Sequence, residues 1–235
     1  MNAYAALVTL HVLLLVFWLG TDMGVFFGSF RLRDPRLSVD ARLAIARLTS
    51  LLDMGPRTGV ILSVPTGLTL AYAGGWARQE MLSPAVLAVV WVVSLAWLAL
   101  VWRYFVIQQR AATRSPSSGD ATFLRLWKRV DVWWRALLAF AIAVATIAAI
   151  GWRGLLGAAW LDWKVALFGF VLACGIAIRI AADDLPLAMG DLARSGSTPE
   201  REGRIARALG RAYPWVIAIY VTVVVMSYLS FAKPS

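Results

Sequence analysis

The only histidine of the chain and its first carboxylate lie on one strongly apolar segment, as His11 and Asp22. At about 100° per residue, His11, Trp18, Asp22 and Ser29 fall on one face of a helix. The histidine and the aspartate are then separated by roughly 16 Å along the helix axis. An imidazole can bind a metal or carry a proton, and an intramembrane carboxylate can also carry a proton. These two groups are the first candidates for chemistry.

A second group of charges opens the next apolar segment, where Asp53 and Arg57 stand four residues apart. This spacing puts both side chains on one helix face, where they can pair. Because consecutive spans run antiparallel, the pair should lie at the depth of Asp22. Charges inside a membrane are costly unless they are paired. We predict a buried cluster of Asp22, Asp53 and Arg57, acting either as an ion-pair clamp or as a proton-handling or anion-facing site.

Lys164 and Met226 are expected at the depth of His11, in the outer half of the membrane. A histidine with a methionine or a lysine is an acceptable axial pair for a haem iron. The residues therefore allow a haem b site in which His11 is one iron ligand, Lys164 or Met226 is the other, and Trp18 walls the macrocycle. The alternatives are a hydrogen-bonded packing role for His11 and a lysine that extends to the membrane surface.

The composition is that of a membrane protein. Apolar residues make up 60% of the 235 residues and charged residues 15%, and the mean hydropathy is +0.72. Soluble domains are nearer about 45–50% apolar and about 25% charged. A soluble enzyme, a disordered chain and a disulfide scaffold are thereby excluded, and one Cys with one His excludes an ordinary zinc site. The net charge of +10 lies in loops between apolar runs, so the membrane explains it and no nucleic-acid partner is expected.

Six apolar runs are long enough to cross a bilayer. They cover residues 3–30, 50–74, 84–108, 132–152, 158–182 and 213–232, approximately. We therefore predict an all-α membrane protein, a six-transmembrane-helix bundle that forms a single integral membrane domain over residues 1–235. A polar linker at 114–119 divides the bundle into two sets of three helices.

The basic residues indicate an orientation. Three stretches, 31–47, 103–135 and 179–211, hold five, seven and six Lys and Arg, which is 18 of the 23 in the chain. Loops rich in Lys and Arg face the cytoplasm. We expect a multi-pass protein of the bacterial inner membrane with both termini periplasmic. Ser38 and the stretch 197–200 look like helix starts. Short interfacial helices, or inward extensions of the next span, should therefore hold arginines at the anionic lipid headgroups of the cytoplasmic face.

Small residues recur every four positions on the first two spans. The first stripe is Gly20, Gly24 and Gly28, and the second is Gly55, Gly59, Ser63, Gly67 and Ala71. Small residues let helix backbones approach closely in lipid. The stripes predict tight packing between these helices.

His11 followed by Phe17-Trp18-Leu19-Gly20 resembles the first helix of the HemJ-type protoporphyrinogen oxidases and of the CopD-like copper-resistance membrane proteins. The second helix of those families is matched by Pro65-Thr66-Gly67-Leu68, and a later W-x-x-x-K motif by Trp160-Leu161-Asp162-Trp163-Lys164. The resemblance covers about half of the chain. It implies a haem-binding role for His11 and a functional role for Lys164.

Three functions follow from these observations. The first is a haem- or tetrapyrrole-binding redox or accessory protein, the function that the resemblance implies. The second is a small proton-coupled transporter or permease that uses Asp22, Asp53 and Arg57. The third is a structural subunit of a membrane complex, or a homo-oligomer, whose contacts are the glycine stripes. The residues define no catalytic set, so enzyme activity stays undecided.

Overall fold

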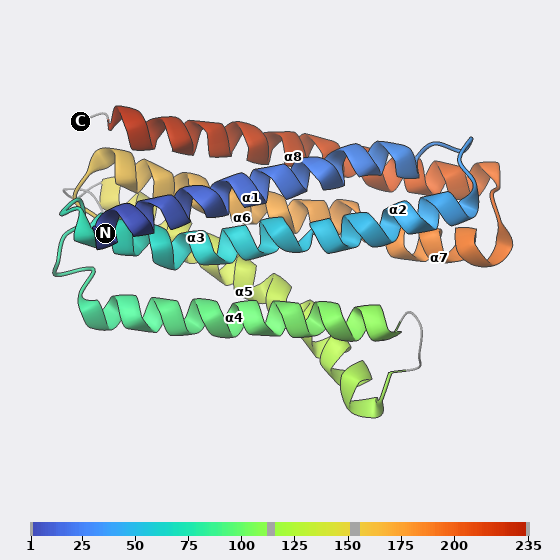
Figure 1. Cartoon of the computed structure of the whole chain (residues 1–235), viewed down its shortest axis with the longest axis horizontal. Coiled ribbons are helices and arrows are strands. Elements are labelled where there is room, and N and C mark those ends of the chain that lie inside the picture. Colours follow the sequence, from blue (N-terminus) through green and yellow to red (C-terminus); the bar gives the residue numbers. More distant parts are fainter. Residues whose placement is uncertain (1, 112–115, 151–155, 234–235) are drawn as a thin grey trace.

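The computed structural model describes residues 2–111, 116–150 and 156–233, and this part of the chain is all α-helical. Its helices are α1 (Ala3–Leu32), α2 (Val39–Leu52), α3 (Met54–Ala73), α4 (Pro84–Ala111), α5 (Ser118–Ile150), α6 (Ala159–Ala181), α7 (Leu185–Ser195) and α8 (Pro199–Ala232). Most of them run along one axis, and both chain termini lie at the same end, here named the terminal end (Figure 1). The opposite end carries α2 and α7 and is named the α7 end.

Five of the helices, α1, α4, α5, α6 and α8, are long and apolar enough to cross a membrane. They make the chain a multi-pass membrane protein and confirm the all-α class. The second predicted span, 50–74, falls across the end of α2 and all of α3, because the helix breaks at Asp53. With Arg57, two prolines and several glycines and threonines, α3 is not among the five.

Two helices begin well before the apolar run inside them. Helix α5 begins at Ser118 and α8 at Pro199, each fourteen residues ahead of the predicted spans 132–152 and 213–232. For α8 the reason is local: the Thr198 side chain caps the helix and Pro199 occupies its first turn, as the sequence of this stretch predicts. Residues 151–152 of the fourth predicted span lie outside the described residues.

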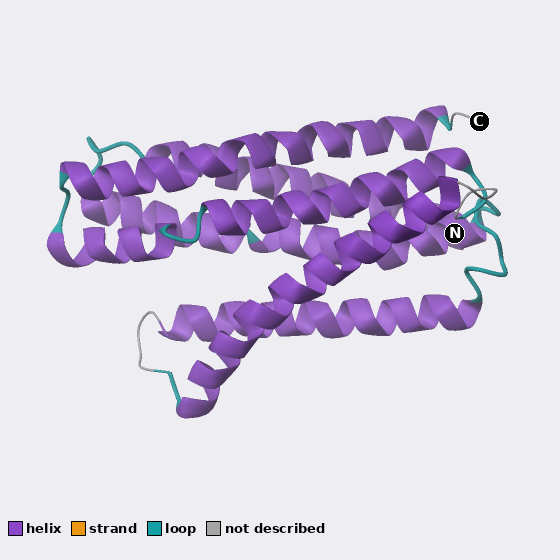
Figure 2. Ribbon diagram, turned by 180° about the vertical axis from the view of Figure 1, so that it is seen from behind, coloured by secondary structure: helices purple, strands orange, loops and turns teal. Residues whose placement is uncertain are grey.

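The long helices pack as two groups. Helix α3 lies along α1 and α4, while α6 lies along α5 and α8. Figure 2 shows α5 running obliquely to the other helices. The groups meet in a core formed by Trp18 and Val60 on one side and Val171, Leu172 and Ile219 on the other.

Gly59 permits the close approach of α1 and α3. A Cβ atom at this position would lie 2.6 Å from the Trp18 Cβ and 3.3 Å from the Leu14 carbonyl oxygen. We expect Gly59→Ala to lower the free energy of unfolding by roughly 1–3 kcal/mol, because backbone and a buried ring must move. Thermal melting in detergent measures the change. Gly20→Ala is the control, since its Cβ would meet nothing within 4 Å; equal melting temperatures for the two variants would contradict the prediction.

The α7 end is a packed extension of the bundle. Helices α2 and α7 and the first half of α8 enclose a core of Leu32, Ala188, Met189, Leu192, Ile205 and Leu209. Arg42 lies fully buried beside this core. Its guanidinium donates to the Leu32 carbonyl and, through two nitrogens, to the Glu202 carboxylate at 2.7 and 2.9 Å. Arg42, which belongs to a stretch expected to hold its arginines at lipid headgroups, is thus buried inside the protein instead.

Candidate functional site

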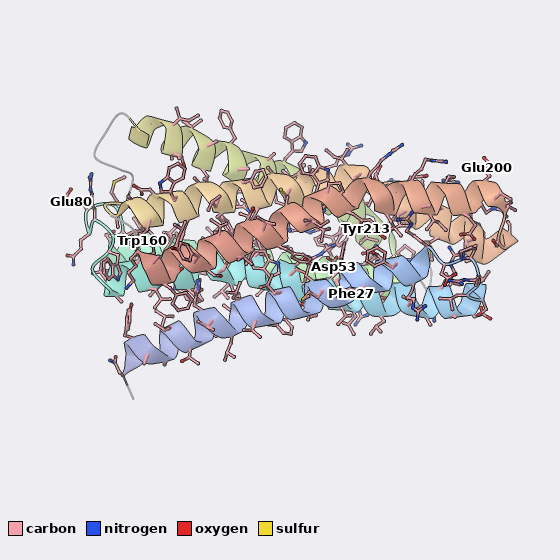
Figure 3. All side chains as sticks on the ribbon, turned by 90° about the horizontal axis from the view of Figure 1, so that it is seen from above. Phe27, Asp53, Glu80, Trp160, Glu200 and Tyr213 are labelled. Carbon is pink, nitrogen blue, oxygen red and sulfur yellow. The ribbon has the colours of Figure 1, made fainter. Side chains whose placement is uncertain are left out.

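Asp53 and Arg57 form the predicted pair at the start of α3. Arg57 Nε donates to Asp53 Oδ2 at 2.8 Å, and Arg57 Nη2 contacts the same oxygen. Asp53 is also the residue at which α2 ends and α3 begins. Figure 3 shows Asp53 near the middle of the long axis of the molecule. The pair is only partly shielded, because about a third of each side chain is exposed.

Asp22 lies close to this pair but forms no hydrogen bond or ion pair with either of its members. Its carboxylate is near enough to that of Asp53 for the two to repel each other, and within the described residues it forms no ion pair. The Tyr220 hydroxyl on α8 lies beside Asp22, yet it is buried without a partner at hydrogen-bonding distance. Of the predicted cluster, the structure thus brings Asp53 and Arg57 into contact and leaves Asp22 as a separate carboxylate between α1 and α8.

A further buried ionic group joins α4, α5 and α6, and we name its residues Trp97, Asp131, Arg135 and Arg179 the Asp131 cluster. Asp131 Oδ2 accepts from Arg135 Nε and from Arg179 Nη2, both at 3.0 Å. Asp131 Oδ1 accepts from the Trp97 indole at 2.9 Å. The Asp131 side chain is 1% exposed. One carboxylate therefore satisfies donors from three helices.

The sequence carries a signal for the Asp131 cluster, although the cluster is not among the predicted sites. Asp131 and Arg135 have the same i,i+4 spacing as Asp53 and Arg57. They stand at the start of the predicted span 132–152. The count of basic residues by stretch treats Arg135, and Arg179 farther along the chain, as loop cations. Only the structure shows that these two arginines face inward, onto a common carboxylate.

The ionic groups form one belt across the bundle. Arg57 is within electrostatic range of Asp131 and of Arg179, and Asp53 is within range of Asp22. The belt has three aspartates and three arginines, so its formal charge is balanced. The pairing is uneven, however, because Asp131 contacts two arginines, while Asp22 forms no ion pair within the described residues. Asp22 is therefore the carboxylate of this belt that has no arginine bonded to it in this part of the chain.

Toward the terminal end, His11 is held by one hydroxyl. His11 Nδ1 lies 2.8 Å from Thr66 Oγ1, and Gly67 leaves room for the ring. The Thr66 hydroxyl has one proton and donates it to the Leu62 carbonyl at 2.7 Å. It must then accept from His11, so the imidazole proton is assigned to Nδ1. Nε2 is left with a bare lone pair, and within the described residues it has no partner.

The other predicted residues of this site divide between two environments. Lys164 is near enough for its charge to act on His11, and it donates to Ser230 Oγ at 2.7 Å. Ser230 donates in turn to the Met226 carbonyl. Trp18 is buried in the apolar core and Met226 packs against it. The structure thus brings Lys164 toward His11, while Trp18 and Met226 contribute to packing.

The described residues contain no group of three or more His, Cys, Asp or Glu side chains that could hold a metal ion. Comparison of the chain with protein-family models, with curated proteins and with solved structures finds no match.

Proposed function

We propose that six helices cross the bilayer of the bacterial inner membrane, with α3 as the sixth and both termini periplasmic. The path of the chain supports a crossing by α3, because α2 lies at the α7 end and α4 begins at the terminal end (Figure 1). The loops between α1 and α2 and between α7 and α8 lie at the α7 end (Figure 1) and belong to two of the three stretches in which Lys and Arg are concentrated, which supports an α7 end in the cytoplasm. Exposed arginines of that end then lie near anionic lipid headgroups.

We infer that the protein is a small proton-coupled transporter in which Asp22 carries the proton. The observation that carries this proposal is the placement of Asp22, a carboxylate that forms no ion pair within the described residues and lies beside the Tyr220 hydroxyl, which is buried without a hydrogen-bond partner. Ionisable groups inside membrane helices that are not neutralised by a partner mark proton and substrate pathways. Asp22 loads or releases a proton without breaking an ion pair.

The position of Asp22 also couples its charge to the helix packing. Asp22 lies on α1, in the first group of helices, and Tyr220 lies on α8, in the second. Helices α1 and α8 contact each other over only a short part of their length. In transporters built from two sets of helices, the sets move against each other around a site at their interface. The charge of Asp22 changes the attraction between α1 and α8, because a charged carboxylate attracts the hydroxyl proton of the nearby Tyr220 more strongly than a neutral one does.

Proton movement in proteoliposomes tests this function. The purified protein is reconstituted with a pH-sensitive dye inside, and pools of small solutes are added outside. We expect at least one pool to drive proton movement, and Asp22→Asn to reduce this signal to that of empty liposomes. Asp183→Asn is the matched control, because Asp183 pairs with Lys128 at the surface, where 68% of its side chain is exposed. No solute-driven movement in the wild type, or equal signals from both variants, would contradict the proposal.

The geometry of His11 favours a second candidate, a haem-binding protein. An axial histidine binds iron through one ring nitrogen while the other is held by a hydrogen bond, and here Thr66 holds Nδ1 and leaves Nε2 free. His11 would therefore be able to hold the iron of a bound haem through Nε2. Lys164 would be the better placed of the two other candidate ligands, since Met226 packs against the apolar core. Bound haem b would supply one-electron chemistry.

The absorption spectrum of the protein expressed with ample haem tests this candidate. We expect a haem band in the wild type and none in His11→Ala. Thr66→Val should weaken haem binding by about tenfold to a hundredfold, because it removes the group that orients the ring. Thr9→Val is the control, since Thr9 bonds only to the carbonyl of its own helix. A colourless wild-type protein would exclude the haem function and leave the proton-coupled one unaffected.

A further inference from the structure

The junction of α6, α7 and α8 at the α7 end has a hollow of about 240 Å³. It is lined by Ala181, Asp184, Arg204, Arg207, Ala208 and Arg211. Three arginines against one aspartate give this lining a formal charge of +2. The hollow is therefore suited to an anion.

The charges in the hollow are not equivalent. Arg204 donates to both oxygens of Asp184, at 3.0 and 2.6 Å, and its remaining nitrogen Nη1 donates to Asp191 at 2.8 Å. Arg204 and Asp184 thus neutralise each other. Arg207 and Arg211 are one turn apart on α8, and within the described residues neither forms a hydrogen bond, an ion pair or a ring contact. Their two guanidinium groups are available to a ligand, and guanidinium pairs match the oxygens of a phosphate.

The hollow lies where the apolar surface of the bundle begins. Trp215 follows Arg211 by four residues on the same face of α8, and it is 41% exposed. Ile180 directly precedes the lining residue Ala181, and it is 73% exposed. Apolar side chains that are exposed on the surface of a membrane protein contact lipid, and tryptophan is typical of the level of the lipid headgroups. The two arginines of the hollow are thus followed along α8 by an exposed tryptophan, and the lining residue of α6 adjoins an exposed isoleucine in the sequence.

We propose that Arg207 and Arg211 bind the phosphate group of an anionic phospholipid, with its acyl chains along Ile180 and Trp215. The proposal rests on the membrane placement given above, and it is independent of proton coupling and of haem. A soluble phosphate compound could bind the same two arginines, but it has no acyl chains to contact the apolar residues. The site binds one lipid of the leaflet at the α7 end.

Native mass spectrometry of the full-length protein in detergent tests the site. Phosphatidylglycerol, phosphatidylcholine and inorganic phosphate are titrated separately, and bound molecules are counted. We expect one phosphatidylglycerol to bind more tightly than phosphatidylcholine. The double variant Arg207→Gln/Arg211→Gln should weaken this binding about thirtyfold, since two basic residues at the headgroup level are lost. Arg47→Gln/Arg129→Gln is the charge-matched control, because both residues are exposed and lie outside the hollow.

Three results would overturn the proposal. Equal weakening by the two double variants would mean diffuse attraction to a basic surface. Inorganic phosphate binding as tightly as phosphatidylglycerol would assign the hollow to a soluble phosphate. A wild type that does not prefer phosphatidylglycerol over phosphatidylcholine has no anionic lipid site. If the glutamine variant does not fold, Arg207→Lys/Arg211→Lys keeps the charge and must still weaken binding, because lysine lacks the planar fork of arginine.

Discussion

Asp131→Leu should lower the free energy of unfolding by roughly 3–5 kcal/mol, because it leaves buried guanidinium groups without a counter-charge. Arg135 and Arg179 both bond to this carboxylate, and the Trp97 indole donates to its other oxygen. All three donors would lose their acceptor inside the bundle. Chemical unfolding in mixed detergent micelles, followed by tryptophan fluorescence, measures the change.

Two further variants identify the cause of this loss. Asp183→Leu also removes an aspartate that pairs with a cation, but more than half of each partner is exposed, so the loss should stay below about 1 kcal/mol. The triple variant Asp131→Leu/Arg135→Leu/Arg179→Leu should regain much of the stability, because no buried charge is left unpaired. If the triple variant unfolds as easily as Asp131→Leu, the three charged residues are not coupled. The loss of stability in Asp131→Leu is then not due to unpaired arginines.

Arg42→Met should open the α7 end, with a local cost of roughly 3–5 kcal/mol. The Arg42 side chain is 1% exposed. It joins the last carbonyl of α1 to Glu202 near the start of α8. Without it, this carbonyl loses its guanidinium donors, and the Glu202 carboxylate keeps the Ser197 hydroxyl but loses its counter-charge. Hydrogen exchange should therefore rise in α2, α7 and the first half of α8, while the membrane-spanning parts of α1 and α6 stay protected.

Arg36→Met serves as the matched control. Arg36 also bonds to a carboxylate, that of Asp34, but 89% of its side chain is exposed, so its loss should leave hydrogen exchange unchanged. Arg42→Lys should recover only part of the protection, because an ammonium group cannot reproduce the bidentate bond to Glu202. Uniform exchange changes over the whole bundle in Arg42→Met would show that the α7 end does not unfold as a separate unit.

The sequence by itself determined the class of the protein and much of its local structure. A chain with so many long apolar runs cannot bury them all in a soluble fold. The membrane class and five of the expected spans therefore follow from the apolar runs of the sequence alone. The caps at Ser38 and Thr198 and the Asp53–Arg57 pair could be predicted because they involve residues at most four positions apart. Helix geometry alone places such residues beside each other.

The tertiary structure decided which charged groups share a site. Arg42 bonds to Glu202 from 160 residues away, and a count of basic residues cannot separate it from arginines that face lipid headgroups. Asp22 meets Tyr220, rather than Arg57, because the packing of α1 brings its carboxylate to α8. Likewise, only the Thr66 contact shows which nitrogen of His11 is free. Apolar periodicity specifies that a helix face is buried, but the partner of each polar atom depends on helix rotation and tilt, and these are set by packing across the whole bundle.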